Sequence, residues 1–109
     1  MTQAAPGYWY DDIDSTSEEA KRRARSGESG PLWIAARRQT AGRGRVGRKW
    51  VSPDGNLFAT LLFTPQEGLA QAARVPFAAG LAVVDACKEI LPNVDFRLKW
   101  PNDVRVDRA

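Results

Sequence analysis

A stretch rich in glycine and arginine is the part of this sequence best suited to chemistry. It reads AGRGRVGRKW from Ala41 to Trp50. Glycine permits positive φ and lets backbone N–H groups approach a ligand closely. Arginine offers a charged planar fork that matches phosphate or carboxylate oxygens in pairs. We therefore expect an anion-binding loop that is mobile when empty and becomes ordered when an anion binds.

The positive charge of the chain is concentrated around this loop. No acidic residue lies between Ser29 and Pro53, but six cations do: Arg37, Arg38, Arg43, Arg45, Arg48 and Lys49. The chain has 16 Lys and Arg against 13 Asp and Glu, a net charge of +3, and without these six it would have ten against 13. The residue types alone leave an anion site, a solvated basic turn and an RNA-binding segment open. The spacing fits neither a Walker A loop nor a dinucleotide-binding turn.

Length and composition exclude several classes. A chain of 109 residues is one domain at most, and 43% hydrophobic with 27% charged residues is typical of a globular protein. A single Cys87 and the absence of histidine exclude an internal disulfide, a Cys/His zinc site and a Ser-His-Asp triad. We find neither a signal peptide nor an apolar run near the roughly 18 residues of a membrane span, so we expect a cytoplasmic protein without a membrane partner.

The first half of the sequence predicts two strands and a helix before the loop. We expect a flexible leader over residues 1–7 and a strand over 8–13. A helix follows with capping-box spacing, either Ser15 with Glu18 or Thr16 with Glu19, and ends near Gly27. Residues 32–36 form a buried strand that delivers the loop at its carboxyl end, and residues 56–63, apolar on both faces, form a central strand antiparallel to it.

The second half predicts a core helix and a hairpin. After a polar connection over residues 64–73, Pro76 fits the first turn of a helix that runs to about Leu91, with Cys87 on its apolar stripe. Residues 96–100 alternate as a strand, residues 101–103 turn the chain, and a further strand begins at Val104.

Three patches now stand in a fixed order: DSTS at 14–17, QTAGRGRVGRKW at 39–50 and KWPND at 99–103. Together they resemble the catalytic domain of biotin–protein ligases, over about residues 8–109. The resemblance implies an α/β (α+β) fold with a mixed, mostly antiparallel sheet and packed helices, like the biotin/lipoate protein ligases and class II aminoacyl-tRNA synthetases. It also implies a reaction in which biotin and Mg-ATP form biotinyl-5′-AMP, and a lysine of a biotin carboxyl carrier protein then takes the biotin.

The resemblance also assigns residues to roles. Arg45, Lys99 and Asp103 are the implied catalytic residues, with Arg45 acting on the biotin carboxylate and the α-phosphate. Trp50 either packs over the nucleotide or anchors the loop as a core residue. The implied biotin-binding residues are Ser15, Thr16, Gln39, Gly42, Arg43, Gly44 and Arg45. The implied nucleotide-binding residues are Arg43, Arg45, Gly47, Arg48, Trp50 and Asn102. No residue is predicted to bind a metal, and Mg²⁺ enters with ATP.

The sequence departs from the family pattern in two places. Ser17 stands where the family usually has Asn, and the chain ends soon after the third patch. We therefore expect the amino-terminal part of a ligase, without a helix-turn-helix domain or a DNA partner, that cannot complete turnover alone; a homodimer stays open. The alternatives are a lipoate–protein ligase, which has similar chemistry, an RNA-binding basic module, and an inert fragment of the same family.

Overall fold

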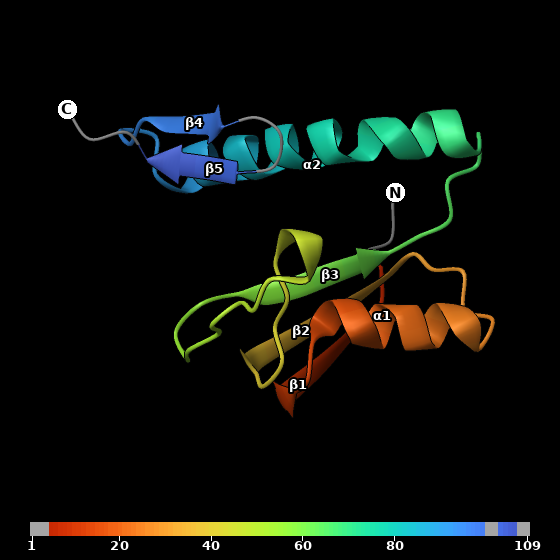
Figure 1. Ribbon diagram of the computed structural model, residues 1–109. Coiled ribbons are helices and arrows are strands. Elements are labelled where there is room, and N and C mark those ends of the chain that lie inside the picture. Colours follow the sequence, from red (N-terminus) through yellow and green to blue (C-terminus); the bar gives the residue numbers. More distant parts are fainter. Residues whose placement is uncertain (1–4, 100–102, 107–109) are drawn as a thin grey trace. The chain divides into compact units, whose positions relative to one another are not determined.

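The computed structural model describes residues 5–99 and 103–106 (Figure 1). The chain divides into two compact units, Met1–Thr64 and Pro65–Ala109, where the sequence predicted at most one domain. The first unit contains β1 (Gly7–Ile13), α1 (Thr16–Arg25), β2 (Leu32–Gln39), the short 3₁₀ turn η1 (Arg45–Gly47) and β3 (Phe58–Leu62). The second contains α2 (Leu69–Ile90), β4 (Phe96–Lys99) and β5 (Asp103–Val106).

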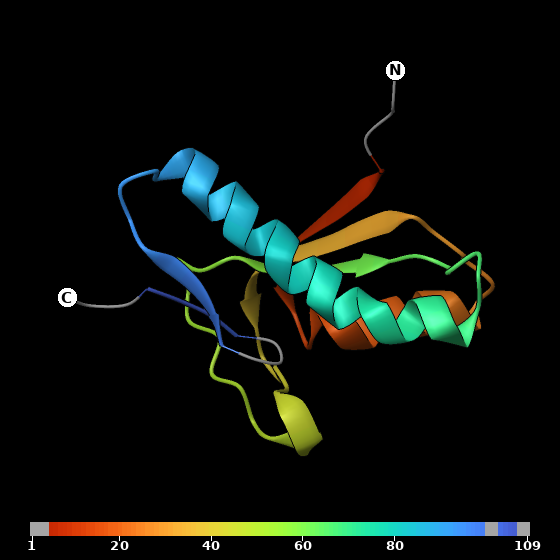
Figure 2. The same cartoon turned by 90° about the horizontal axis from the view of Figure 1, so that it is seen from above.

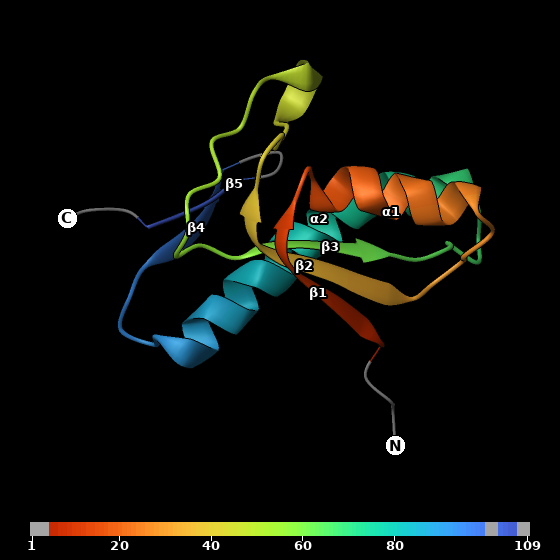
Figure 3. The ribbon, with the colours of Figure 1, turned by 90° about the horizontal axis from the view of Figure 1, so that it is seen from below.

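The first unit is a three-stranded sheet in the order β1-β2-β3. β1 runs parallel to β2, and β3 runs antiparallel to it, as predicted for the strands that flank the basic loop. The prediction that the third strand is central is wrong, because β2 takes that place among the described strands. An apolar stretch shows that a strand is buried but not how many neighbours it has. The loop between β2 and β3 carries η1 at its tip, beyond the end of the sheet (Figures 2 and 3).

β2 places its side chains alternately on the two faces of the sheet. Leu32, Ile34 and Ala36 are buried, whereas Trp33 keeps 44% of its surface exposed, so the strand is buried on one face and not on both. Ile34, with no exposed surface, packs with Ala20 of α1 in the core. Full burial of such a side chain stabilises the fold by about 1.5–3 kcal/mol. This core fixes the face of the sheet on which α1 lies.

α1 begins and ends as its sequence predicts. The Ser15 hydroxyl accepts a hydrogen bond from the Glu18 backbone N–H at 3.3 Å, so Ser15 is the cap, as in the first of the two predicted pairs. The Ser15 N–H donates to Asp14 at 2.8 Å and not to Glu18, so only one half of a capping box is formed. Gly27 follows the helix with φ +102°, a conformation that glycine adopts without strain. An acidic first turn and a basic last turn both complement the helix dipole.

The second unit consists of α2 and the antiparallel hairpin β4–β5. α2 begins seven residues before the predicted start and contains Pro76 within it, so that prediction is wrong. Proline lacks the N–H of an interior helix bond, which made a helix start the simpler interpretation. Val84 is the buried residue of the apolar stripe. A Cβ built on Gly80 would lie 2.8 Å from Leu98 Cδ1, so the glycine allows β4 to pack closely on the helix.

α2 also corrects the expectation about apolar segments. Among the described residues, this one helix is long enough and apolar enough to cross a membrane, judged by length and composition alone. The core helix of a soluble protein meets the same two conditions. Cys87 on this helix is a half-buried free thiol.

Candidate active site

The basic loop forms a small hydrogen-bonded hairpin. The Trp50 backbone N–H donates to the Gly42 carbonyl at 2.8 Å, and the Gly44 N–H donates to the Arg48 carbonyl at 2.6 Å. Arg43 and Lys49 form an antiparallel bridge between these two bonds. The hairpin brings most of the predicted anion-binding residues into one short segment. That the loop orders when an anion binds stays a prediction.

The tip of this hairpin has an unusual backbone. Val46 lies in the left-handed region, with φ 60° and ψ 34°, and its side chain is 93% exposed. A β-branched residue rarely adopts this conformation. Gly47, with φ +68°, continues it without a steric cost. The backbone of Arg45 is part of this turn, whereas its side chain lies outside what the structure describes.

Five of the six cations of the sequence segment have described side chains, and these five fall into two groups. Arg38 binds Asp12 through two bonds of 2.7 and 3.0 Å, which holds the pKa of that carboxyl below its usual range. Arg37 forms a longer ion pair, with 3.8 Å between its Nε and Asp54 Oδ1. Within residues 5–99 and 103–106, the exposed side chains of Arg43, Arg48 and Lys49 form no ion pair. The charge available to a ligand is therefore that of the hairpin, and not of all six residues.

Gln39 connects this hairpin to the start of α1. Its side-chain oxygen accepts hydrogen bonds from the Thr16 backbone N–H at 2.8 Å and from the Thr16 hydroxyl at 3.3 Å. Its side-chain nitrogen donates to the Ser52 hydroxyl at 3.1 Å, and that hydroxyl donates to the Trp50 carbonyl at 3.2 Å. Residues predicted at the biotin end and the base of the hairpin thus belong to one hydrogen-bonded chain.

Parallel pairing of β1 with β2 explains why these segments meet. The Thr40 and Ala41 backbone N–H groups donate to the carbonyls of Ile13 and Asp14, each at 2.8 Å. The carboxyl ends of the two strands therefore lie side by side, and Ser15 follows directly at 2% exposure. Thr16, Ser17 and Thr60 extend the polar cluster: the Thr16 and Thr60 hydroxyl oxygens are 2.8 Å apart, and those of Ser17 and Thr60 are 3.4 Å apart.

Gly42 lies where no side chain fits. A Cβ built there would meet Ser52 Oγ at 2.6 Å, the Trp50 carbonyl oxygen at 2.7 Å and Gln39 Nε2 at 2.9 Å. A Cβ at Gly44 would lie 3.3 Å from Trp50 Cε3, so this indole lies against Gly44. Trp50 itself is 59% exposed, so the alternative prediction that it is a core residue is wrong.

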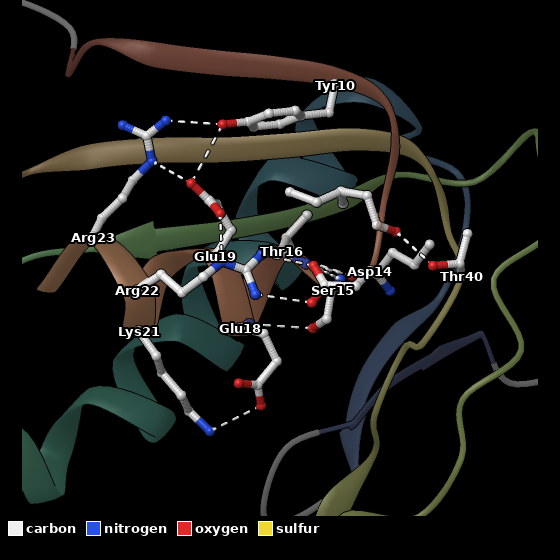
Figure 4. A network of polar contacts seen from close by, with 12 residues as sticks. Tyr10, Asp14, Ser15, Thr16, Glu18, Glu19, Lys21, Arg22, Arg23 and Thr40 are labelled. Carbon is white, nitrogen blue, oxygen red and sulfur yellow. Dashed lines mark hydrogen bonds and ion pairs between the residues drawn. The ribbon is translucent and has the colours of Figure 1, made fainter. Parts of the chain in front are cut away.

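A network of ion pairs supports the cluster from the side of α1 (Figure 4). Arg22 forms two bonds to Asp14, at 2.7 and 2.9 Å, and a third to Glu19 at 2.8 Å. Asp14 also accepts from the Ser15 backbone N–H at 2.8 Å. Bonding to Arg22 and to that N–H lowers the pKa of Asp14 to about 2. This clamp holds the residue that precedes the predicted biotin-contacting pair.

Within α1, Glu19 and Arg23 form an ion pair one helical turn apart, at 3.0 Å. Arg22 binds Asp14 and Glu19 and not Glu18. Ser52 and Thr60 also belong to the site, although neither is predicted from the sequence. Their hydrogen-bond partners are distant in the chain, so no local sequence pattern indicates their role.

The predicted residues of the third patch belong to the second unit. Lys99, the last residue of β4, pairs in register with Asp103, the first residue of β5, and both side chains are exposed. Lys99 also lines a hollow together with Arg97, Leu98 and Arg105. The predicted nucleotide contact Asn102 lies outside the described residues. All other predicted site residues belong to the first unit.

Taken alone, the first unit's site offers cations for an anionic ligand and oriented hydroxyl and amide groups for a polar one. Across the described residues, no group of three or more His, Cys, Asp or Glu could hold a metal ion. The first unit therefore offers groups for two kinds of ligand, an anionic one at the hairpin and a polar one at the Gln39–Thr16 cluster.

Comparison with known proteins agrees with this arrangement. Residues 9–109 match the model of the biotin/lipoate A/B protein ligase family. A biotin–[acetyl-CoA-carboxylase] ligase of Paracoccus denitrificans is 49% identical over 92 residues, which cover 84% of this chain and 38% of that protein. The human biotin–protein ligase is 42% identical over 82 residues, 71% of this chain and 11% of that protein.

Solved structures give the same result. The biotin protein ligase of Aquifex aeolicus, in complex with biotin and ATP, superposes with a TM-score of 0.78 at 40% identity, over 91% of this chain and 40% of that one. The Leishmania major enzyme in complex with biotinyl-5-AMP gives 0.74 at 30% identity, over 93% and 47%. The predicted α/β fold with a mixed, mostly antiparallel sheet is confirmed. The chain spans less than half the length of these relatives, and it belongs to the biotin/lipoate A/B protein ligase family.

Proposed function

We propose that these residues form the biotin- and adenylate-binding part of an ATP-dependent biotin–protein ligase. The observation that carries the proposal is the hairpin, whose Arg43, Arg48 and Lys49 form no ion pair with any described residue, hydrogen-bonded through Ser52 to the Gln39–Thr16 cluster. Relatives solved with biotin and ATP, and with biotinyl-5-AMP, support the choice of ligands.

The first step joins two anions. A biotin carboxylate oxygen attacks the α-phosphorus of ATP, a new P–O bond forms, and the bond to pyrophosphate breaks. Cations placed beside the reacting oxygens in advance lower the barrier that repulsion imposes, by several kcal/mol where water is excluded. We assign Arg45 to the carboxylate and α-phosphate, and Arg43 and Arg48 to the phosphates.

The second step transfers the acyl group. The amine of a lysine on a biotin carboxyl carrier protein attacks the acyl carbon of biotinyl-5′-AMP, AMP leaves, and the amine loses a proton. We assign Asp103 to orientation of this amine, with Lys99 beside it. A loop closed over the mixed anhydride keeps water from hydrolysing it.

The remaining assignments follow the geometry of the first unit. Buried hydroxyls and an amide face the biotin end, and glycines allow the backbone to approach both ligands. We assign Ser15, Thr16, Gln39, Gly42 and Gly44 to biotin, and Gly47 and Trp50 to the nucleotide. Asn102, which lies outside the described residues, is assigned to the nucleotide by the family resemblance alone. We treat Mg²⁺ as a companion of the ATP phosphates, which it binds with few protein ligands.

We further propose a cytoplasmic location and no DNA partner. Relatives in Bacillus subtilis and Escherichia coli, 31% and 37% identical, are named bifunctional ligase/repressor. A gel-shift assay with duplex DNA would therefore decide this part, and sedimentation would decide whether the chain forms a homodimer.

Two other functions need their own tests. The family description covers lipoate ligases, so lipoate must be compared with biotin as the acid. RNA binding through the hairpin would weaken steeply with salt and would not respond to biotin.

The experiment is mass spectrometric detection of biotinyl-5′-AMP after the chain is mixed with biotin and Mg-ATP. Arg45→Ala should abolish the product, while Arg38→Ala, which removes a nearby cation already paired with Asp12, should leave most of it. We expect adenylate formation without full turnover. If a version extended to the length of the relatives also makes no adenylate from biotin, the proposed function is wrong.

A further inference from the structure

We propose that Ser52 is a positioning residue that fixes the orientation of the Gln39 amide and couples the two halves of the site. Neither the residue's type nor its place after Val51 marks it in the sequence. Its side chain is 8% exposed, and it has partners on both sides. The inference rests on the proposed function for its ligand, but its structural part can be tested without one.

The direction of each hydrogen bond follows from donor chemistry. A backbone N–H can only donate, so the Gln39 atom that lies 2.8 Å from the Thr16 nitrogen must be the amide oxygen. The amide nitrogen therefore faces Ser52, whose hydroxyl accepts from it at 3.1 Å. That hydroxyl uses its own hydrogen for the Trp50 carbonyl, which cannot donate, at 3.2 Å. Reversal of the amide would break the bond to the Thr16 N–H and would leave the single Ser52 hydroxyl hydrogen facing two acceptors, the Gln39 oxygen and the Trp50 carbonyl.

The same chain of bonds ties down the base of the hairpin. The Trp50 carbonyl accepts from Ser52, and the Trp50 N–H donates to the Gly42 carbonyl. Both backbone groups of Trp50 are thus occupied at the point where the hairpin closes. Two side chains, those of Gln39 and Ser52, therefore connect Thr16 to the backbone at the base of the hairpin.

Removal of the Ser52 hydroxyl should therefore act at a distance. In Ser52→Ala the Gln39 nitrogen and the Trp50 carbonyl each lose a partner, and the amide becomes free to rotate. We expect the Thr16 amide hydrogen, 36 positions earlier in the chain, to exchange with solvent about tenfold faster, because loss of one partner in a buried pair is worth about this factor. Exchange is read by NMR relative to the Ile34 amide of the central strand, which reports overall unfolding.

Three further variants separate the hydroxyl from its surroundings. Ser52→Thr keeps the hydroxyl, and Ser52→Val has the shape of threonine but no hydroxyl. Slow Thr16 exchange should return in the first and not in the second. Ser26→Ala deletes a serine hydroxyl that donates to the Arg23 carbonyl at 2.7 Å, at the other end of α1, and should leave the Thr16 amide unchanged.

The functional consequence is measured as biotin affinity by calorimetry on the same chain. We expect about a tenfold weaker affinity in the Ala and Val variants, recovery in Thr, and a larger change in the KM for biotin than in kcat wherever adenylate forms. Unchanged Thr16 exchange in Ser52→Ala, or equal behaviour of the Thr and Val variants, overturns the proposal. If the unmodified chain binds no biotin, the ligand assignment fails, while the exchange data still decide whether Ser52 holds Gln39.

Discussion

Gly42→Ala is the most direct test of the site geometry. The new methyl group would lie 2.6 Å from Ser52 Oγ, 2.7 Å from the Trp50 carbonyl oxygen and 2.9 Å from Gln39 Nε2. Real Cβ atoms essentially never approach another heavy atom this closely, within 3.0 Å. One of the three is backbone that already closes the hairpin, so it cannot move without breaking the Gly42–Trp50 bond of 2.8 Å.

The cost can be estimated from its parts. Overpacking of a fixed site costs about 1–3 kcal/mol. If the neighbours move instead, the bonds of Ser52 to Gln39 and to Trp50 are lost, at about 0.5–1.5 kcal/mol each. Restriction of the unfolded chain by alanine returns about 0.4–1 kcal/mol. We therefore expect a net loss of up to about 2.6 kcal/mol, or about 1–3 kcal/mol relative to a Gly→Ala change that meets no close neighbour, either from the whole unit or from the hairpin alone.

Two measurements distinguish these outcomes. Urea denaturation gives the free energy of unfolding, and amide exchange at Trp50 reports on the base of the hairpin. The matched control is Gly7→Ala, whose Cβ would make only an ordinary contact of 3.8 Å with Trp33 Cβ. The reasoning is refuted if Gly42→Ala matches the control within about 0.5 kcal/mol and also keeps the Trp50 amide protected.

Three further predictions concern charges and side-chain length. Arg48→Ala should weaken Mg-ATP binding about tenfold by calorimetry, since a charge-assisted bond is lost, while Arg38→Ala should not; equal effects would contradict the division of the cations. Asp14 has its pKa lowered from 3.8 to about 2, so its bond to Arg22 contributes stability above pH 3.8 and loses it as the pH falls toward 2. Because the pair is exposed, Asp14→Asn should flatten that acid limb by no more than about 1 kcal/mol in pH-dependent denaturation. Ser17→Asn, which introduces the usual family residue, should tighten biotin binding a few-fold, and weaker binding would show that the Ser17–Thr60 contact is needed.

Several elements of the first unit could be predicted from the sequence because they depend on local chemistry. The capping serine, the terminal glycine of α1 and the antiparallel strands around the basic loop all depend on residues close in the chain. The place of β3 at the edge and the early start of α2 do not, because the number of strand neighbours and the tolerance of Pro76 are set by tertiary packing.

The site was predictable to the extent that its residues carry a charge or a glycine pattern. The residue type alone marked Arg43 and Arg48 as candidates. The structure adds that these two have no acidic partner among the residues it describes, whereas Arg37 and Arg38 are each paired with an aspartate. Ser52 and Thr60 are ordinary residues whose importance comes from atoms more than ten positions away in sequence. Only the packed structure reveals such partners, because hydrogen-bond geometry depends on fractions of an ångström.

The parallel pairing of β1 and β2 is what makes one site from two separate motifs. β1 is seven residues long, and a strand rises about 3.3 Å per residue. Had β1 paired antiparallel, its end at Ile13 would lie roughly 20 Å from Gln39, and Thr16 could not reach the amide. A slip of one residue would instead turn Tyr10 away from the core that contains Ile34. The burial of Ile34 and Ala20 therefore selects the register, and the register brings Thr16, Gln39 and the cationic hairpin together.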